Sequence, residues 1–461
     1  MSRLIEDRAW AGRLAKAAWL VLVFAAAAVT LTPSKASAMK IQEVKSPGGI
    51  TAWLVEEHSV PLIAVRFAFD GGSSQDPVGK DGLANFLSGM LDEGAGNLNS
   101  KQFQERMEEI AMRMSFEDGR DAFYGSFETL TQNRASAVEL LTLAITKPRF
   151  DAEAVERMRA QYLAGLVAAS RDPARVSAEQ WMALAFAGHP YGRPPNGTPQ
   201  SVAGITRDDL VAFRARTFAK DTLRVVAVGD IDAAALGAML DTIFGALPAK
   251  AKLTPVANTE PKAAQRLKVI DMNVPQSVAR FGLPALARKD KDFMASFILN
   301  NIFGGGFTSR LYNEVREKRG LAYGVDSSII PLKNASVFIG NVATKNEEIG
   351  QSLEVIRSEL RRIATEGVTA EELNDAKSYL TGSFALRFDT NANIANQLLW
   401  MMVEGLGTSY VDTRNAQIDA VTLDDIKRVA KRLFDGQEPI VTVVGKPKGV
   451  TPTPTPTAQG G

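Results

Sequence analysis

The sequence predicts an α+β fold of two homologous domains, each a mainly antiparallel sheet with helices packed on one face. The main observation is an internal repeat: residues 205–210 (Ile-Thr-Arg-Asp-Asp-Leu) recur 216 positions later as residues 421–426 (Val-Thr-Leu-Asp-Asp-Ile). The same spacing relates Gly229 to Gly445, each at the end of an apolar run. In both copies the pattern is typical of a capped helix followed by a buried strand.

A second pair of helix starts supports the duplication. Asp151 and Thr369 each stand before an acidic first turn, and each is expected to cap a long amphipathic helix. The strands expected from apolar runs are 51–55, 62–69, 122–129 and 223–228 in the first copy, and 266–271, 278–282, 337–342 and 440–444 in the second.

These patterns place the first domain at residues 40–250 and the second at residues 266–447. Residues 251–265 between them contain two prolines and lysines, so we expect a linker that runs over the surface. Residues 451–457 alternate Thr and Pro, so we expect residues 448–461 to form an extended, disordered tail. A docking segment or spacer is the alternative for the tail.

Residues 1–38 have the features of a signal peptide. Basic residues precede an apolar run from Ala17 to Leu31, and small residues stand before position 39. The run is shorter than the about 20 residues that span a bilayer. We therefore expect a periplasmic protein without a stable membrane span after cleavage, with an uncleaved N-terminal anchor as the alternative.

Composition narrows the classes of function. The 461 residues carry a formal charge of +1, and no basic run with interleaved aromatics occurs, which argues against a nucleic-acid partner. The chain has no cysteine, so a secreted form depends on its core rather than on disulfides. It has two histidines, His58 in a polar turn and His189 in a Gly/Pro-rich loop, and neither has a partner at ligand spacing.

Residues 85–89 stand where an inverted zinc motif, H-x-x-E-H, would fit. The frame reads Asn85-Phe86-Leu87-Ser88-Gly89, so the apolar positions are kept while both histidines and the glutamate are replaced. A second motif, Ser309-Arg310-Leu311 followed by Arg316-Glu317-Lys318-Arg319-Gly320-Leu321-Ala322-Tyr323, is intact. Together the two motifs resemble the pitrilysin/insulinase family of zinc metallopeptidases, in particular the zinc-motif-lacking subunit of its short bacterial two-domain type.

The resemblance covers nearly all of the chain after residue 40 and implies that the two domains face each other like a clamshell. It also implies a third metal ligand, a glutamate on a later helix, which falls on or next to Gly165. A catalytic zinc needs about three protein ligands and an open position. Asn85, Ser88, Gly89 and Gly165 are therefore degenerate metal-site positions and not ligands, and we expect this chain to bind no metal and no other cofactor.

The resemblance assigns catalytic roles to Arg316 and Tyr323, which would contact the substrate carbonyl. A guanidinium and a phenol are donors that suit a developing oxyanion. Gly320 between them is expected to end the helix and turn Tyr323 onto a strand. The alternative is an arginine in a surface ion pair and a tyrosine packed at a strand start.

Gly304, Gly305 and Gly306 precede that helix and are expected to form a flexible substrate-binding loop, an anion site being the alternative. The resemblance also implies that peptide adds as a strand to a sheet edge, which we expect near residues 122–127.

The leading hypothesis is a non-zinc subunit of a heterodimeric periplasmic zinc metallopeptidase, inactive alone. Its partner would be a homologous subunit that bears the zinc, and its substrate a peptide or unfolded polypeptide. The alternative is a non-catalytic peptide-binding or assembly protein of the same fold. A self-sufficient hydrolase with Ser88 as nucleophile is disfavoured, because no histidine lies near it in sequence.

Overall fold

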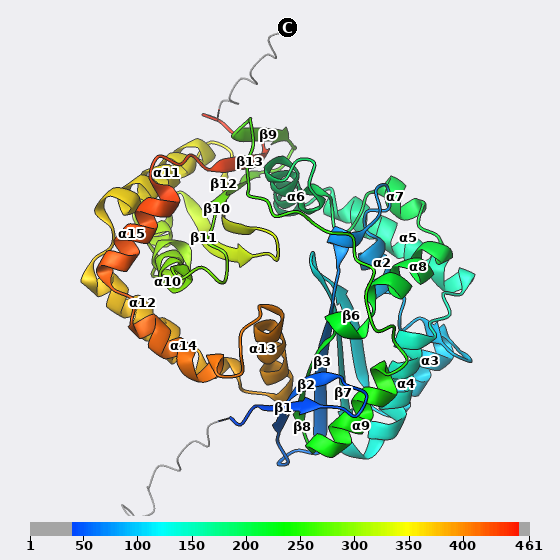
Figure 1. The fold of residues 1–461 in the computed structure, drawn as a ribbon. Helices are drawn as coiled ribbons and strands as arrows, with labels where there is room; N and C mark the ends of the chain where they lie inside the picture. The colour runs from blue at the N-terminus through cyan, green and yellow to red at the C-terminus, as the bar shows by residue number, and fades with distance from the viewer. Residues whose placement is uncertain (1–38, 451–461) are drawn as a thin grey trace, which may run out of the picture. The chain divides into compact units, whose positions relative to one another are not determined.

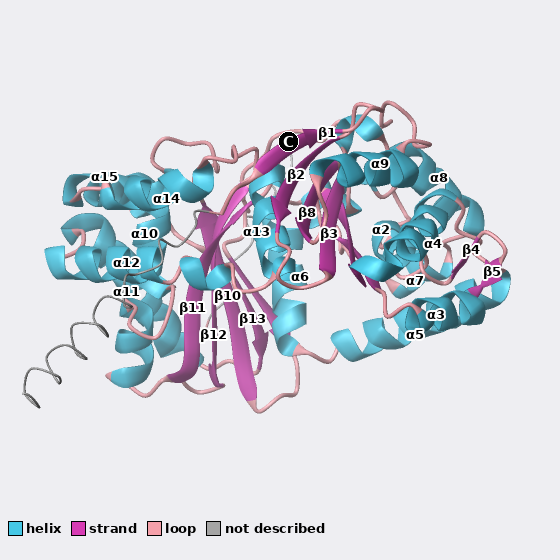
Figure 2. Cartoon of the chain, turned by 90° about the horizontal axis from the view of Figure 1, so that it is seen from below, coloured by secondary structure: helices cyan, strands magenta, loops and turns pink. Residues whose placement is uncertain are grey.

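Two sheets organise the chain (Figures 1 and 2). The first contains, in spatial order, β1 (Gln42–Lys45), β2 (Thr51–Glu56), β8 (Arg224–Gly229), β3 (Leu62–Asp70), β7 (Ala122–Leu130) and β6 (Arg113–Asp118). The second contains β11 (Ala322–Pro331), β12 (Ser336–Lys345), β10 (Gln276–Pro284), β13 (Ile440–Gly445) and β9 (Leu267–Asp271). A short pair, β4 (Gly94–Ala95) and β5 (Leu98–Asn99), stands apart from both.

The structure is a computed structural model that describes residues 39–450. The predicted signal peptide, 1–38, and residues 451–461 of the predicted tail lie outside the described residues. Lys448, at the start of that tail, is held by a hydrogen bond from its N–H to the carbonyl of Asn346 (2.8 Å). Among the described residues, 42–450 form one compact unit. No helix within residues 39–450 is long and apolar enough to cross a membrane.

The two sheets repeat one topology, as the duplicated sequence predicts. Apart from β1, the order β2-β8-β3-β7-β6 matches the order β9-β13-β10-β12-β11 strand for strand. In each sheet one pair is parallel, β2 with β8 and β9 with β13, while the other pairs are antiparallel. Because both copies keep this mixed pattern, the predicted α+β fold class with mainly antiparallel sheets is confirmed.

Fourteen helices are described around these sheets. Their bounds are α2 (Leu83–Ser88), α3 (Ser100–Glu109), α4 (Arg134–Thr146), α5 (Ala152–Ala169), α6 (Pro173–Ala185), α7 (Pro199–Ala203), α8 (Arg207–Thr217), α9 (Ala233–Phe244), α10 (Phe293–Gly304), α11 (Ile349–Glu366), α12 (Ala370–Gly382), α13 (Asn391–Val403), α14 (Tyr410–Asp419) and α15 (Leu423–Phe434). A π-helical turn, η5 (Tyr312–Glu317), precedes β11.

Helix starts follow the predicted capping chemistry with one exception. Thr206, Thr369 and Thr422 each close a capping box at the start of their helix. Asp151 stands at the N-cap of α5, but its carboxylate makes no cap hydrogen bond and instead accepts one from Arg149 (2.7 Å). The prediction of a side-chain cap at Asp151 was wrong because the neighbouring guanidinium competes for the carboxylate.

Each sheet packs one face on a hydrophobic core of its own half. The first core draws its buried residues from positions 44–247 and the second from positions 267–443. In the first sheet, Ile63, Val65, Phe67 and Phe69 of β3 point into this core.

The other face of the first sheet is covered by α13, a helix from the second half of the chain (Figure 1). Ala64 and Ala68 of β3 are fully buried on this face, and their small side chains allow close packing. Between them Arg66 donates through Nε to Asn396 on α13 (2.8 Å) and forms an ion pair with Glu128. This second covered face explains why the 62–69 run alternates only partly, since both faces of β3 are buried.

The exchange is reciprocal, because α6 from the first half packs on β13 and β10 of the second sheet. Trp181 on α6 is fully buried, and its indole N–H donates to the carbonyl of Ile440 (2.9 Å). Gly282 makes room for it, since a Cβ at that position would lie 2.4 Å from the indole ring. Ser177 adds a contact between its hydroxyl and that of Thr442 (3.1 Å). Sequence patterns did not predict this exchange of helices.

We predict that Trp181→Ala lowers the free energy of unfolding by about 3–5 kcal/mol, because it leaves a cavity and an unpaired carbonyl between α6 and β13. Urea denaturation followed by circular dichroism measures the change. The matched control is Val167→Ala on α5, which is half exposed and is expected to change stability by no more than about 0.5 kcal/mol. Equal effects of the two substitutions would contradict the role given to α6.

Candidate functional site

The degenerate metal-site positions meet at one place, on α2 and α5. Asn85 and Gly165 line the same cavity of about 490 Å³, together with Tyr162. The Asn85 side-chain amide donates to Asp118 Oδ1 on β6 (2.7 Å). Ser88 donates its hydroxyl to the Asn85 carbonyl (2.7 Å), so the serine is not aimed at any base. The fold therefore brings Asn85 and Gly165 together, although they lie 80 residues apart in the chain.

Tyr162 occupies the space beside the position of the second histidine. The Tyr162 hydroxyl donates to the Asn85 carbonyl (2.9 Å). A Cβ on Gly89 would lie only 2.5 Å from the Tyr162 hydroxyl oxygen. Burial raises the pKa of the Tyr162 hydroxyl, which keeps it a neutral donor. A Cβ on Gly165 would meet no atom within 4 Å, so no other side chain of the protein fills the space beside this glycine.

These residues do not fit a zinc ion. An amide, a hydroxyl and two glycines offer no imidazole and no thiolate, and the Asp118 carboxylate beside them is engaged by Asn85. Burial raises the pKa of Asp118, partly offset by the hydrogen bond from Asn85. Within residues 39–450 no group of three or more His, Cys, Asp or Glu side chains is placed to hold a metal ion.

The two histidines lie away from this cavity. His58 is exposed and contacts Asp230 (2.7 Å) and Glu56 (3.4 Å), and these hydrogen bonds raise its pKa. His189 accepts from the Tyr191 N–H through Nδ1 (3.1 Å) and contacts the Ala257 carbonyl through Nε2 (2.9 Å). Both therefore have the turn and loop environments that the sequence predicted.

Arg316 and Tyr323 lie against each other at the start of β11. The Arg316 guanidinium stacks over the Tyr323 ring with its carbon 4.7 Å from the ring centre, and the Tyr323 side chain is 83% exposed. The nearest carboxylate to Arg316 is Glu317, at 3.7 Å from Nε. Gly320 between them has a φ of +62°, a left-handed conformation that suits glycine and ends the helical turn as predicted. The pair thus presents two hydrogen-bond donors close to solvent.

The three glycines of the predicted loop have different surroundings. Gly304 packs against β11, where a Cβ would lie 2.3 Å from Ser327 Oγ, and Gly305 packs on Asn301 of its own helix. Gly306 is open on all sides. The following Phe307 is 80% exposed and meets the ring of Tyr312 edge-on, with 5.2 Å between centroids.

Sequence reasoning missed Tyr312, which contacts Arg316 directly. The Arg316 guanidinium donates to the Tyr312 hydroxyl and lies 4.8 Å from its ring centre. The signal was present, because residues four apart on a helix face the same side.

The predicted peptide-binding edge at residues 122–127 was wrong. That segment belongs to β7, which pairs with β3 on one side and β6 on the other. The outermost strand is β6, which pairs with β7 alone and lies beside α2. Strand order depends on long-range pairing, so an apolar run by itself does not identify the edge.

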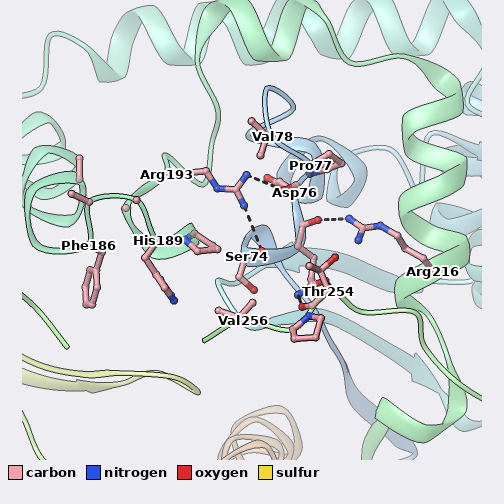
Figure 3. Close-up of a pocket in the computed structure, with 17 residues that line it drawn as sticks. Ser74, Asp76, Pro77, Val78, Phe186, His189, Arg193, Arg216, Thr254 and Val256 are labelled. Carbon is pink, nitrogen blue, oxygen red and sulfur yellow. Dashed lines mark hydrogen bonds between the residues drawn. The ribbon is translucent and has the colours of Figure 1, made fainter. Parts of the chain in front are cut away.

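A separate cavity of about 540 Å³ lies beside the start of α2 (Figure 3). Asp76 on its wall accepts hydrogen bonds from the N–H groups of Gly82 (2.8 Å) and Ala84 (2.9 Å), and so caps α2 through a loop. Arg193 donates to the Asp76 carbonyl (2.9 Å), and Arg216 donates to the main chain of Gln75 (Figure 3). Burial raises the pKa of Asp76 to about 7, partly offset by the two N–H donors.

Comparisons with known proteins agree with this geometry. Residues 53–198 match the insulinase family, peptidase family M16, and residues 204–380 match the peptidase M16 inactive domain. The chain is 28% identical over 402 residues to the non-peptidase homolog YmxG of Helicobacter pylori, covering 86% of this chain and 92% of that one. It is 27% identical over 416 residues to an uncharacterized zinc protease of Streptomyces coelicolor, covering 88% and 89%.

Solved structures give the same result. A peptidase M16 inactive domain from Pseudomonas fluorescens superposes with a TM-score of 0.83 at 28% identity, covering 89% of this chain and 98% of that one. A protease from Helicobacter pylori shares the fold, with a TM-score of 0.79 at 19% identity over 88% and 99% of the two chains. This chain belongs to the M16 peptidase family and is a homologue of its inactive, non-peptidase type.

We predict opposite effects for two glycine substitutions. Gly89→Ala should lower the free energy of unfolding by about 1–3 kcal/mol, because the new methyl group would overlap the Tyr162 hydroxyl. Gly165→Ala should raise it by about 0.5–1 kcal/mol, because that site is open and helical. Urea denaturation measures both. If Gly89→Ala in a Tyr162→Phe background were still as harmful, the clash with the hydroxyl would be disproved.

A second prediction concerns pH. The folded-state pKa of Asp76 is raised from 3.8 to about 7, so its contribution to stability is full below pH 3.8 and is lost as pH rises toward 7. Relative to Asp76→Asn, the wild-type protein should lose on the order of 3 to 4 kcal/mol of unfolding free energy across this range. Denaturant titrations at a series of pH values measure the difference. A difference that did not vary with pH would show that Asp76 titrates normally.

Proposed function

We propose that this chain is the non-zinc subunit of a heterodimeric periplasmic zinc metallopeptidase. The observation that carries the proposal is that the two motifs differ: the metal-site positions are replaced, whereas the Arg316–Tyr323 pair is present. The positions that would hold zinc carry no metal-binding side chain, and Asn85 and Tyr162 are held there by hydrogen bonds within the protein, while Arg316 and Tyr323 are adjacent and close to solvent. If Arg316 and Tyr323 act in catalysis, the zinc must be supplied by another molecule, because the described residues of this chain hold no metal site.

The proposed role of the pair follows from its chemistry. The guanidinium of Arg316 and the hydroxyl of Tyr323 would donate to the carbonyl oxygen of a peptide held at the partner subunit's zinc site. Such donors contribute most when they are fixed before the substrate arrives. Peptide or unfolded polypeptide is the expected substrate, because main-chain carbonyls are the groups that two such donors would recognise.

The edge strand β6 offers a further place for an extended segment to bind. It pairs on one side only, and Asp118 at its end lies beside the cavity of Asn85. Addition of a strand there would supply main-chain hydrogen bonds without any chemistry. This feature favours the second candidate function, a non-catalytic peptide-binding or assembly protein, and the name of the Helicobacter pylori relative, a non-peptidase homolog, agrees with it.

The periplasmic location rests on the sequence of residues 1–38. Zinc, in this proposal, belongs to the partner subunit, and this chain contributes its own donors and a binding surface.

The test is Arg316→Ala in the purified two-chain complex. We expect kcat for a quenched peptide to fall by about 100-fold or more, as for loss of one oxyanion donor, while gel filtration shows the complex intact. The control is Arg361→Ala, an exposed arginine on α11, which should leave kcat unchanged. Unchanged turnover by Arg316→Ala would exclude a shared active site and favour the binding protein.

A further inference from the structure

Two irregularities of the backbone meet at the Arg316–Tyr323 pair. The first is η5, in which the Lys318 N–H donates to the Asn313 carbonyl (2.9 Å), five residues back rather than four. In a π-helical turn, as in an α-helical one, residues four apart face the same side. Tyr312 and Arg316 are four apart, and their side chains stack (4.8 Å).

The second irregularity is a β-bulge at the start of β11. Ala322 pairs with Thr344 and Gly324 pairs with the next residue, Ala343, so Tyr323 is an extra residue without a partner on β12. Ala322 and Val325 are both buried in the core although they are three apart, which a regular alternating strand would not allow. The bulge therefore turns Tyr323 out toward Arg316 while its neighbours stay in the core.

The result is a guanidinium between two aromatic rings. Arg316 lies 4.8 Å from the ring centre of Tyr312 and 4.7 Å from that of Tyr323, and donates to the Tyr312 hydroxyl. Phe307 meets the ring of Tyr312 edge-on. An arginine side chain free in water loses about 2 kcal/mol of rotamer entropy when it is fixed. The two rings and the hydroxyl hold it in one orientation before any ligand arrives.

We propose that Tyr312 is a positioning residue, and that the π-helical turn and the bulge together place Arg316 between Tyr312 and Tyr323. The effect of Tyr312 on turnover rests on the proposed function, whereas the stacking of Arg316 between Tyr312 and Tyr323 does not. If Arg316 donates to a peptide carbonyl, loss of Tyr312 leaves the donor present but no longer aimed. The expected signature is a lower kcat with little change in KM.

The stack is tested on the chain alone, with phenylglyoxal as an arginine-specific probe and peptide mass mapping as the readout. We expect Arg316 to react about fivefold faster or more in Tyr312→Ala than in the wild type, because the ring no longer shields it. Tyr312→Phe, which keeps the ring, should remain within about twofold of the wild type. Exposed Arg361 serves as the internal reference in each sample. Equal reactivity of Arg316 in all three proteins would overturn the proposed stack.

The consequence is tested in the two-chain complex, with Arg316→Ala beside the Tyr312 variants. We expect Tyr312→Ala to lower kcat by about 10-fold with KM within about twofold. Tyr312→Phe, which keeps the ring, should have a kcat much closer to that of the wild type. If Arg316→Ala lowered kcat and Tyr312→Ala did not, the positioning role would be overturned while the proposed function stood. If Arg316→Ala itself had no effect, the proposed function would fail, and the phenylglyoxal result would still decide whether Tyr312 holds Arg316.

Discussion

The fold depends on an exchange of helices between two copies of one unit. Each sheet packs one face on its own core, and the other face would expose apolar side chains if the halves were separate. In the first sheet α13 covers that face, and in the second α6 does so. Burial of apolar surface is the main stabilising term in folding, so each half removes from water the surface that the other leaves uncovered. Two polar contacts, Trp181 to Ile440 and Arg66 to Asn396, fix the register of this exchange.

The same framework explains how the first half holds together without a metal ion. In the first half, Tyr162 and Asn85 satisfy each other, and Gly89 accepts the close approach of the tyrosine hydroxyl. A buried polar network is stable only when its members are all paired, and this one needs no metal to be so. In the second half, Arg316 on η5 stacks on Tyr323 at the start of β11, and Tyr323 is exposed.

Much of this could be predicted from the sequence because it is local. The capping boxes at Thr206 and Thr422 depend on residues three apart, and the buried strands on runs of five to nine residues. The proximity of Asn85 and Gly165 was expected only through family resemblance, since Gly165 has no local pattern of its own.

What sequence patterns missed depends on distant partners. The exchange of α6 and α13, and the place of β6 rather than β7 at the sheet edge, follow from pairings of residues far apart in the chain. The cap of α2 by Asp76 arises through a loop, so no spacing rule finds it. Tyr312 could have been found from its spacing to Arg316, but the π-helical turn that aligns them differs from an α-helix by one hydrogen-bond step.

In the proposed function, this chain completes an active site whose metal lies on another chain. The most direct measurement is gentle isolation of the tagged mature protein from its own cell envelope, followed by determination of subunit stoichiometry, zinc content and chelator-sensitive cleavage of a quenched peptide library. We expect a one-to-one complex with a homologous chain, one zinc per complex and cleavage that a chelator abolishes. A zinc-free, inactive monomer or homodimer would contradict it and would make the chain a peptide-binding or assembly protein.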